Sequence, residues 1–177
     1  KKTLFDNGTR IPLIVSGPGI NKNEKIMDAP VEMIDIYPTL MDLTGKKTPS
    51  FVSGKSFASL LKDSSKRVRK SALTELIIGS KDKMAQGYSI KTNRYRLTQW
   101  GENGVHGYEL YDHKFDKPEL NNLANEEAYR ALKDSLKKVI RDRIADARKI
   151  PDGIGQQNIP KETGEPKPIY SQPKSKF

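Results

Sequence analysis

The residues of this chain best suited to chemistry are two lysines at its start and two histidines further along. Lys1 and Lys2 precede an apolar segment, which places them at the end of a strand or the mouth of a loop, where an ammonium group can meet an anion. His106 and His113 could act as acid–base groups or metal ligands. Both lie in loop-like segments, however, and we interpret them as bystanders.

A group of carboxylates surrounds the second histidine: Asp112, Asp116 and Glu119. Their spacing lacks the glycine turn and the ligand pattern of a calcium loop. Because aspartate and proline also favour chain reversal, this stretch is interpreted as a turn rather than a cation site. The chain has no cysteine, which excludes disulfides, thiolate metal sites and a cysteine nucleophile within it.

The net charge of +10, from 32 basic and 22 acidic residues, suggests a polyanionic partner. The basic residues are spread along the chain, and the densest run, residues 66–70, has no aromatic side chains that would stack on bases. We interpret this run as a solvated loop and expect no nucleic-acid partner. A non-catalytic polyanion-binding module remains an alternative. No apolar run reaches the roughly 20 residues of a membrane span, so none is expected.

The elements before residue 71 are short. Residues 12–17 contain the continuous apolar run 13–15 and end in glycine, which predicts a strand buried on both faces, as in parallel α/β sheets. Asp35 is predicted to cap a helix of about two turns that ends before Gly45. Residues 57–61 form a short apolar anchor ahead of the basic loop.

From Ser71 the pattern changes to strands. Candidates lie at residues 72–78, 87–91, 94–100 and 108–111, and Thr92-Asn93 predicts a tight hairpin. Alternation in the third candidate predicts one solvent-exposed sheet face. Asn125 is expected to cap a long amphipathic helix that ends near Lys149 and covers the other face. The tail that follows is rich in proline and lysine, which predicts an extended segment.

Several segments together resemble one enzyme family. They are residues 1–12 (KKTLFDNGTRIP), 35–45 (DIYPTLMDLTG), 54–61 (GKSFASLL), 87–100 (GYSIKTNRYRLTQW) and 109–124 (ELYDHKFDKPELNNLA). In this order they resemble the C-terminal part of type I sulfatases, the formylglycine-dependent members of the alkaline phosphatase superfamily. Residues 87–100 look closest to the iduronate-2-sulfatase-like branch.

The resemblance implies an α/β fold with an α+β C-terminal unit. Residues 1–70 would be the end of an alkaline-phosphatase-like α/β catalytic domain. Residues 71–150 would be a small subdomain of four antiparallel strands and one long amphipathic helix, and residues 151–177 an extended Pro/Lys-rich tail. The separate reading of the strand and helix patterns predicts the same second unit.

The resemblance also implies an activity, the hydrolysis of sulfate esters, with sulfated sugars or glycosaminoglycans as the expected substrates. Lys1 aligns with the family's catalytic lysine, which contacts the sulfate ester. Lys2, Trp100 and His106 are candidate substrate-binding residues, and Arg10 is interpreted as structural. A phosphodiesterase or phosphonate hydrolase of the same superfamily is an alternative.

The family's cofactors are calcium and a formylglycine nucleophile made from cysteine or serine. The resemblance places both outside this chain, in an N-terminal sulfatase segment preceding Lys1, so no metal ligand is expected here and the chain alone is expected to be inactive. That missing segment and a sulfated carbohydrate are the expected partners. A periplasmic or secreted location follows from the family.

Overall fold

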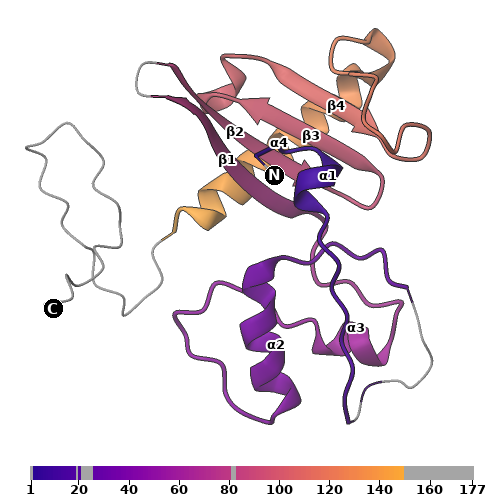
Figure 1. Cartoon of the computed structure of the whole chain (residues 1–177), viewed down its shortest axis with the longest axis vertical. Helices are drawn as coiled ribbons and strands as arrows, with labels where there is room; N and C mark the ends of the chain where they lie inside the picture. Colours follow the sequence, from indigo (N-terminus) through magenta and orange to yellow (C-terminus); the bar gives the residue numbers. More distant parts are fainter. Residues whose placement is uncertain (1, 19, 21–25, 81–82, 150–177) are drawn as a thin grey trace, which may run out of the picture.

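The computed structural model describes residues 2–18, 20, 26–80 and 83–149. A sheet with a long helix forms one part, and the segments before the sheet form a second part beside it (Figure 1). Helix α1 (Asp6–Thr9) lies against the sheet (Figure 1), and the second part contains a 3₁₀ turn at Met33–Asp35, α2 (Ile36–Leu43) and α3 (Ala58–Lys62). The sheet contains β1 (Ala72–Ser80), β2 (Lys83–Lys91), β3 (Tyr95–Trp100) and β4 (Tyr108–Asp112), with 3₁₀ turns at Glu102–Gly104 and Glu127–Tyr129 before helix α4 (Arg130–Ala147).

The predicted sheet is confirmed: its strands are antiparallel and lie in the order β1-β2-β3-β4. The register places Ile90 beside Leu97 and Leu97 beside Leu110, so one apolar row crosses β2, β3 and β4. Helix α4 covers this row, as its amphipathic pattern predicts, and its buried residues Leu136, Ile140 and Ile144 complete the core. Burial of this shared face is what holds the two layers together.

The expectation that the other sheet face is exposed to solvent is wrong. Arg96 and Thr98, which alternation placed on a wet face, are each 1% exposed. Helix α1 lies across this side of the sheet (Figure 1), and the buried side chain of Leu4 precedes it. Alternation within a strand reports only which residues share a face, whereas its exposure depends on what packs there.

The strand predicted at residues 12–17 is absent. These residues form no regular secondary structure, and Leu13 and Ile14 are 44% and 90% exposed. A strand needs partners for its backbone N–H and C=O groups. Within the described residues the sheet consists of β1 to β4, and none of them pairs with this segment.

Helix α2 forms where the sequence predicts it and ends as predicted, with Gly45 at φ +67°. Asp35, however, makes no side-chain cap to α2. It is fully buried, and its carboxylate accepts hydrogen bonds from Arg69 and from the backbone N–H groups of Glu32 and Lys55, at 2.9 and 2.7 Å for the last two. The predicted apolar anchor is confirmed by the buried side chains of Phe57, Leu60 and Leu61.

The basic run at residues 66–70 is only partly a solvated loop. Arg67 is exposed, but Arg69 is buried against Asp35. Beside this pair, Glu32 accepts a hydrogen bond from the backbone N–H of Leu73 at 2.7 Å and one from Arg143 of α4 at 2.5 Å. Glu32 therefore connects the region before the sheet to both the sheet and helix α4, which together are called the sheet unit below.

Helix α4 begins later than predicted. Asn125 is not its N-cap, because a 3₁₀ turn at Glu127–Tyr129 comes first and Tyr129 occupies the cap position. The predicted tail at 151–177 lies outside the described residues. Among the residues described, no helix combines the length and apolar character needed to cross a bilayer.

Candidate functional site

The two lysines predicted to meet an anion stand at the head of the N-terminal segment. Lys1 lies outside the described residues, and Lys2 is exposed. Leu4, two residues later, is 3% exposed and packs over Gly87 of β2. A Cβ atom on Gly87 would lie 2.6 Å from Leu4 Cδ1 and 2.7 Å from Trp100 Cζ3. The absence of a side chain at Gly87 therefore lets Leu4 and Trp100 pack together.

Trp100 and His106 bracket the connection between β3 and β4. The His106 N–H donates to the Trp100 carbonyl and the Trp100 N–H donates to the Gly107 carbonyl, both at 3.0 Å. The exposed imidazole of His106 lies over Gly101, whose φ of +73° suits glycine. The structure thus brings Trp100 together with the segment that follows Lys2 and keeps His106 at the same end of the sheet.

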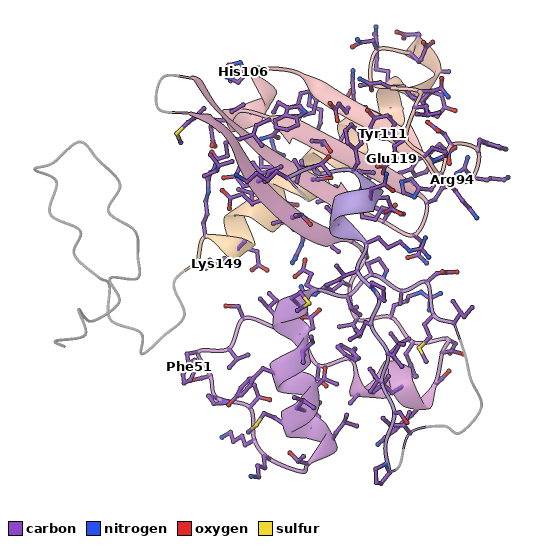
Figure 2. The ribbon with its side chains drawn as sticks, in the orientation of Figure 1. Phe51, Arg94, His106, Tyr111, Glu119 and Lys149 are labelled. Atoms are coloured by element: carbon purple, nitrogen blue, oxygen red, sulfur yellow. The ribbon has the colours of Figure 1, made fainter. Side chains whose placement is uncertain are left out.

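A buried ionic cluster lies toward the other end of the sheet; Figure 2 shows His106 at one end and Glu119 and Arg94 at the other. At its centre is Arg96 of β3. The Arg96 Nη2 group donates to Asp6 Oδ1 at 2.8 Å and to Thr9 Oγ1 at 3.0 Å, and its Nε donates to Glu119 Oε1 at 2.5 Å. One guanidinium thereby joins α1 to the loop after β4.

Glu119 completes the cluster from the loop between β4 and α4. Its Oε2 accepts the backbone N–H of Asp6 at 2.7 Å, and its Oε1 lies 2.6 Å from His113 Nε2. The bystander interpretation of His113 is therefore wrong. Glu119 lies in the predicted turn, with its N–H donating to the Asp116 carbonyl at 3.3 Å, and its side chain also joins the cluster. Glu119 pairs with Arg96, and His113 joins the cluster through Glu119.

The turn interpretation is correct for the two aspartates. Asp112 accepts the N–H of Lys114 at 3.0 Å, and Asp116 accepts those of Leu120 and Asn121 at 3.1 and 2.8 Å. These bonds lower the pKa of Asp116. For Asp112, the hydrogen bond from Arg94 is the main cause of its lowered pKa.

Burial also shifts the pKa values of two groups near the cluster, Lys91 and Tyr111. Burial lowers the pKa of Lys91, and the nearby charge of Arg96 lowers it further. Burial raises the pKa of Tyr111 to about 12, with the charge of Glu109 next in effect. The Tyr111 ring also meets Phe5 edge-on, with 5.8 Å between ring centroids.

The ligand atoms of Asp6, His113 and Glu119 lie within 4.8 Å of one another. The cluster nevertheless does not fit calcium, which prefers oxygen ligands only. The guanidinium of Arg96 already donates to both carboxylates and supplies the cation between them. Formylglycine has no place in this chain either, because there is no cysteine and its only Pro-Ser pair, Pro49-Ser50, is followed by Phe51.

Sequence reasoning missed the cluster, although one signal was present. Asp6 stands at the acidic position of the N-terminal motif, and Arg10 stands four residues later. Arg10 is mostly exposed and pairs with Asp6 at 3.8 Å. The partner that matters more for Asp6 is Arg96, which no local pattern could identify.

Comparison with known proteins gives a consistent family match. The family described as "N-sulphoglucosamine sulphohydrolase, C-terminal" matches residues 1–146. A sulfatase of Formosa agariphila is 31% identical over 79% of this chain and 25% of its own length. A Delta 4,5-hexuronate-2-O-sulfatase of Bacteroides thetaiotaomicron is 32% identical over 72% of this chain and 27% of its own length.

A solved structure described as a 2-O GAG sulfatase is also similar, with a TM-score of 0.65 and 29% identity over 75% of this chain and 29% of that one. The similarity extends to the fold, so the four-stranded sheet and long helix are those of sulfatases. The chain spans about a quarter of the length of the curated relatives it matches.

Proposed function

Because this chain belongs to the family of N-sulphoglucosamine sulphohydrolase C-terminal domains, we propose that it is the C-terminal portion of an enzyme that hydrolyses sulfate esters. The observation that carries this proposal is the family match over residues 1–146, which includes the N-terminal lysine motif. Residues 1–70 would close the catalytic domain, residues 71–150 would form the C-terminal subdomain, and residues 151–177 would be an extended tail.

In this proposal Lys1 is the catalytic residue of the chain. A compact ammonium group beside the sulfate offsets negative charge on the ester and on the leaving oxygen as the S–O bond breaks. Lys2, Trp100 and His106 would contact the sugar. The packing of Leu4 with Trp100 supports this common site. It brings the start of the chain, residues 2–6 (the lysine segment), to the end of the sheet that carries His106.

Calcium and the formylglycine nucleophile would be supplied by the segment of the enzyme that precedes Lys1. Formylglycine would supply the nucleophile, and calcium, when bound, would supply electrophilic assistance at the sulfate. The residues of this chain would bind and orient the ester. The poor fit of the Asp6–His113–Glu119 cluster to calcium agrees with this division.

The surface of the region before the sheet supports such a preceding segment. Met33, Tyr37 and Leu40 are 63%, 49% and 55% exposed, and their spacing of four and three residues places them on one side of the chain's helical segment. An exposed apolar group of this kind marks an interaction surface. We propose that the upstream part of the same enzyme covers it.

Two relatives suggest the substrate class. A protein 32% identical to this chain is described as a Delta 4,5-hexuronate-2-O-sulfatase, and the similar solved structure as a 2-O GAG sulfatase. We therefore propose 2-O-sulfated uronate units of glycosaminoglycans as the substrate, and a periplasmic or secreted enzyme that meets such polymers.

The test uses the complete enzyme, including the segment before Lys1, produced with formylglycine maturation. We expect it to release sulfate from a 2-O-sulfated unsaturated disaccharide, and the variant Lys1→Ala to lose this activity by about 100-fold or more, as expected when a charge-stabilising group is removed. Phosphate and phosphonate esters are assayed in parallel. Faster turnover of these esters than of sulfate esters would reject the sulfatase assignment in favour of the phosphodiesterase alternative.

A further inference from the structure

Arg96 joins three segments that are distant in sequence, and one of them begins beside the proposed catalytic lysine. We propose that Asp6, Arg96 and Glu119 form a latch that holds the N-terminal segment in the position required for catalysis. Asp6 and Arg96 are then positioning residues, which act through the segment rather than on the substrate. This inference rests on the proposed function.

The geometry of the latch is specific. Arg96 is 1% exposed, and its fork-shaped guanidinium reaches Asp6 Oδ1 and Thr9 Oγ1 with one nitrogen and Glu119 Oε1 with another. A third nitrogen donates to Ser89 Oγ at 3.2 Å. Lysine offers a single charged point and could not reproduce this set of donors.

The latch acts on the backbone of the segment as well as on its side chains. Glu119 accepts the N–H of Asp6 at 2.7 Å, so the start of α1 is fixed even though a helix of this length has little stability by itself. Phe5 packs against Tyr111, and Leu4 packs beside Trp100 over Gly87. Residues 4–6 are thus held in turn, and only two residues separate Leu4 from Lys1 along the chain.

A second arginine at the same end of the sheet, Arg94 just before β3, provides a natural control. Arg94 makes a two-pronged pair with Asp112, with distances of 2.7 and 2.5 Å, comparable to the contacts of Arg96. The partner of Arg94 belongs to β4, so this pair joins only parts of the sheet unit. Loss of either pair affects folding, but only loss of the Arg96 pair releases the lysine segment.

The experiment compares Asp6→Asn, Arg96→Lys, the double variant and Arg94→Lys in the complete enzyme. Sulfate release from a 2-O-sulfated disaccharide gives kcat and KM, and circular dichroism with urea unfolding gives the folded fraction and stability. Asp6→Asn keeps the size of a partly exposed side chain and is the variant most certain to fold.

We expect Asp6→Asn and Arg96→Lys each to lower kcat by about 10- to 100-fold, because misplacement of a catalytic group by about 1 Å has effects of that size. KM should change less than kcat, because only the contacts of Lys1 and Lys2 are disturbed while the remaining substrate contacts persist. The double variant should lose little more than the worse single variant. Arg94→Lys should keep the wild-type kcat.

Three outcomes would overturn the inference, and they separate its failure from that of the proposed function. If the wild-type enzyme releases sulfate and folded Asp6→Asn retains its kcat, or if Arg94→Lys loses as much kcat as Arg96→Lys, the positioning role is wrong while the proposed function stands. If the wild-type enzyme releases no sulfate from any ester tested, the proposed function fails and the positioning role fails with it.

Discussion

Asp35 and Arg69 form a buried ion pair, although they lie 34 positions apart along the chain. The Arg69 Nε group donates to Asp35 Oδ2 at 2.7 Å, and Nη2 contacts Oδ1 as well. The Arg69 side chain is 3% exposed and the Asp35 side chain 0%. This pair fixes the loop before β1 against the start of α2, so it determines how the first part of the chain meets the sheet.

Removal of Arg69 should destabilise the protein strongly. We expect Arg69→Met to lower the free energy of unfolding by about 3–5 kcal/mol, because it leaves the Asp35 carboxylate buried without its cation. The measurement is urea unfolding followed by circular dichroism. Arg67→Met, at an exposed position two residues away, should change stability by no more than about 0.5 kcal/mol. Equal effects of the two variants would contradict this role.

The same pair should make stability sensitive to acid. Burial raises the pKa of Asp35, but the hydrogen bonds from Arg69, Lys55 and Glu32 outweigh it, and the net pKa lies below its ordinary value. A lowered pKa means that the carboxylate stabilises the fold fully above the unfolded value of about 4 and that this contribution disappears as the pH falls through the folded value. We expect Asp35→Asn to be less stable at neutral pH and to show a flatter decline toward pH 3. The measurement is urea unfolding at a series of pH values. If the unfolding free energies of Asp35→Asn and the wild type fell in parallel toward pH 3, this role of Asp35 would be contradicted.

Tyr111 should make the stability of the protein depend on pH in the alkaline range. Burial raises its pKa to about 12, against about 10 in an unfolded chain. The folded state therefore favours the neutral phenol, and this contribution is complete below pH 10 and is lost as the pH rises from 10 to 12. Tyr111→Phe should remove this loss, so its unfolding free energy should fall less over that range than that of the wild type. The check is guanidinium unfolding at a series of alkaline pH values.

Gly87 should be required for the contact between Leu4 and Trp100. In Gly87→Ala the new Cβ would meet both side chains at less than 3 Å, so they must move apart, at a cost of about 1–3 kcal/mol. Trp100 is the only tryptophan of the sequence, so its fluorescence should shift to longer wavelength as water reaches the ring.

Gly45→Ala is the matched control for this substitution. No atom lies within 4 Å of its added Cβ, but φ is +67°, so it should lose about 1–2 kcal/mol from backbone strain alone. Its tryptophan emission should stay unchanged. A shift in Gly45→Ala, or none in Gly87→Ala, would mean that fluorescence does not report on the Leu4 contact.

Substitution of Leu40 should affect the stability of the isolated chain and of the complete enzyme differently. Because its side chain is 55% exposed here, Leu40→Ser should alter the stability of the isolated chain by no more than about 0.5 kcal/mol. If the upstream part covers the exposed half of Leu40, as we propose, the same change should cost the complete enzyme about 0.8–1.6 kcal/mol of lost apolar burial. Equal small effects in both proteins would argue against that cover.

Much of the sheet unit was predictable because its signals are local. The apolar periodicity that ends at Ile144, the alternation through Tyr95 and Leu97 and the Thr92-Asn93 hairpin each depend on neighbours within a few residues. The same holds for α2 and its stop at Gly45. The residues of the N-terminal lysine motif could also be recognised in sequence, because a motif is a property of order and spacing.

Three features were decided only by the tertiary structure. They are the burial of Arg96, the contacts of Glu119 and His113 in the ionic cluster, and the absence of a strand at residues 12–17. A charged residue on an alternating strand is expected in water, and Arg96 is buried because Asp6, 90 positions earlier, supplies a carboxylate on the covering segment. Residues 12–17 have the composition of a buried strand, yet no described strand pairs with them. The sequence determined which segments could form helices and strands; the meeting of distant charges and the presence or absence of a pairing partner determined which surfaces are buried, since both depend on contacts that no local pattern encodes.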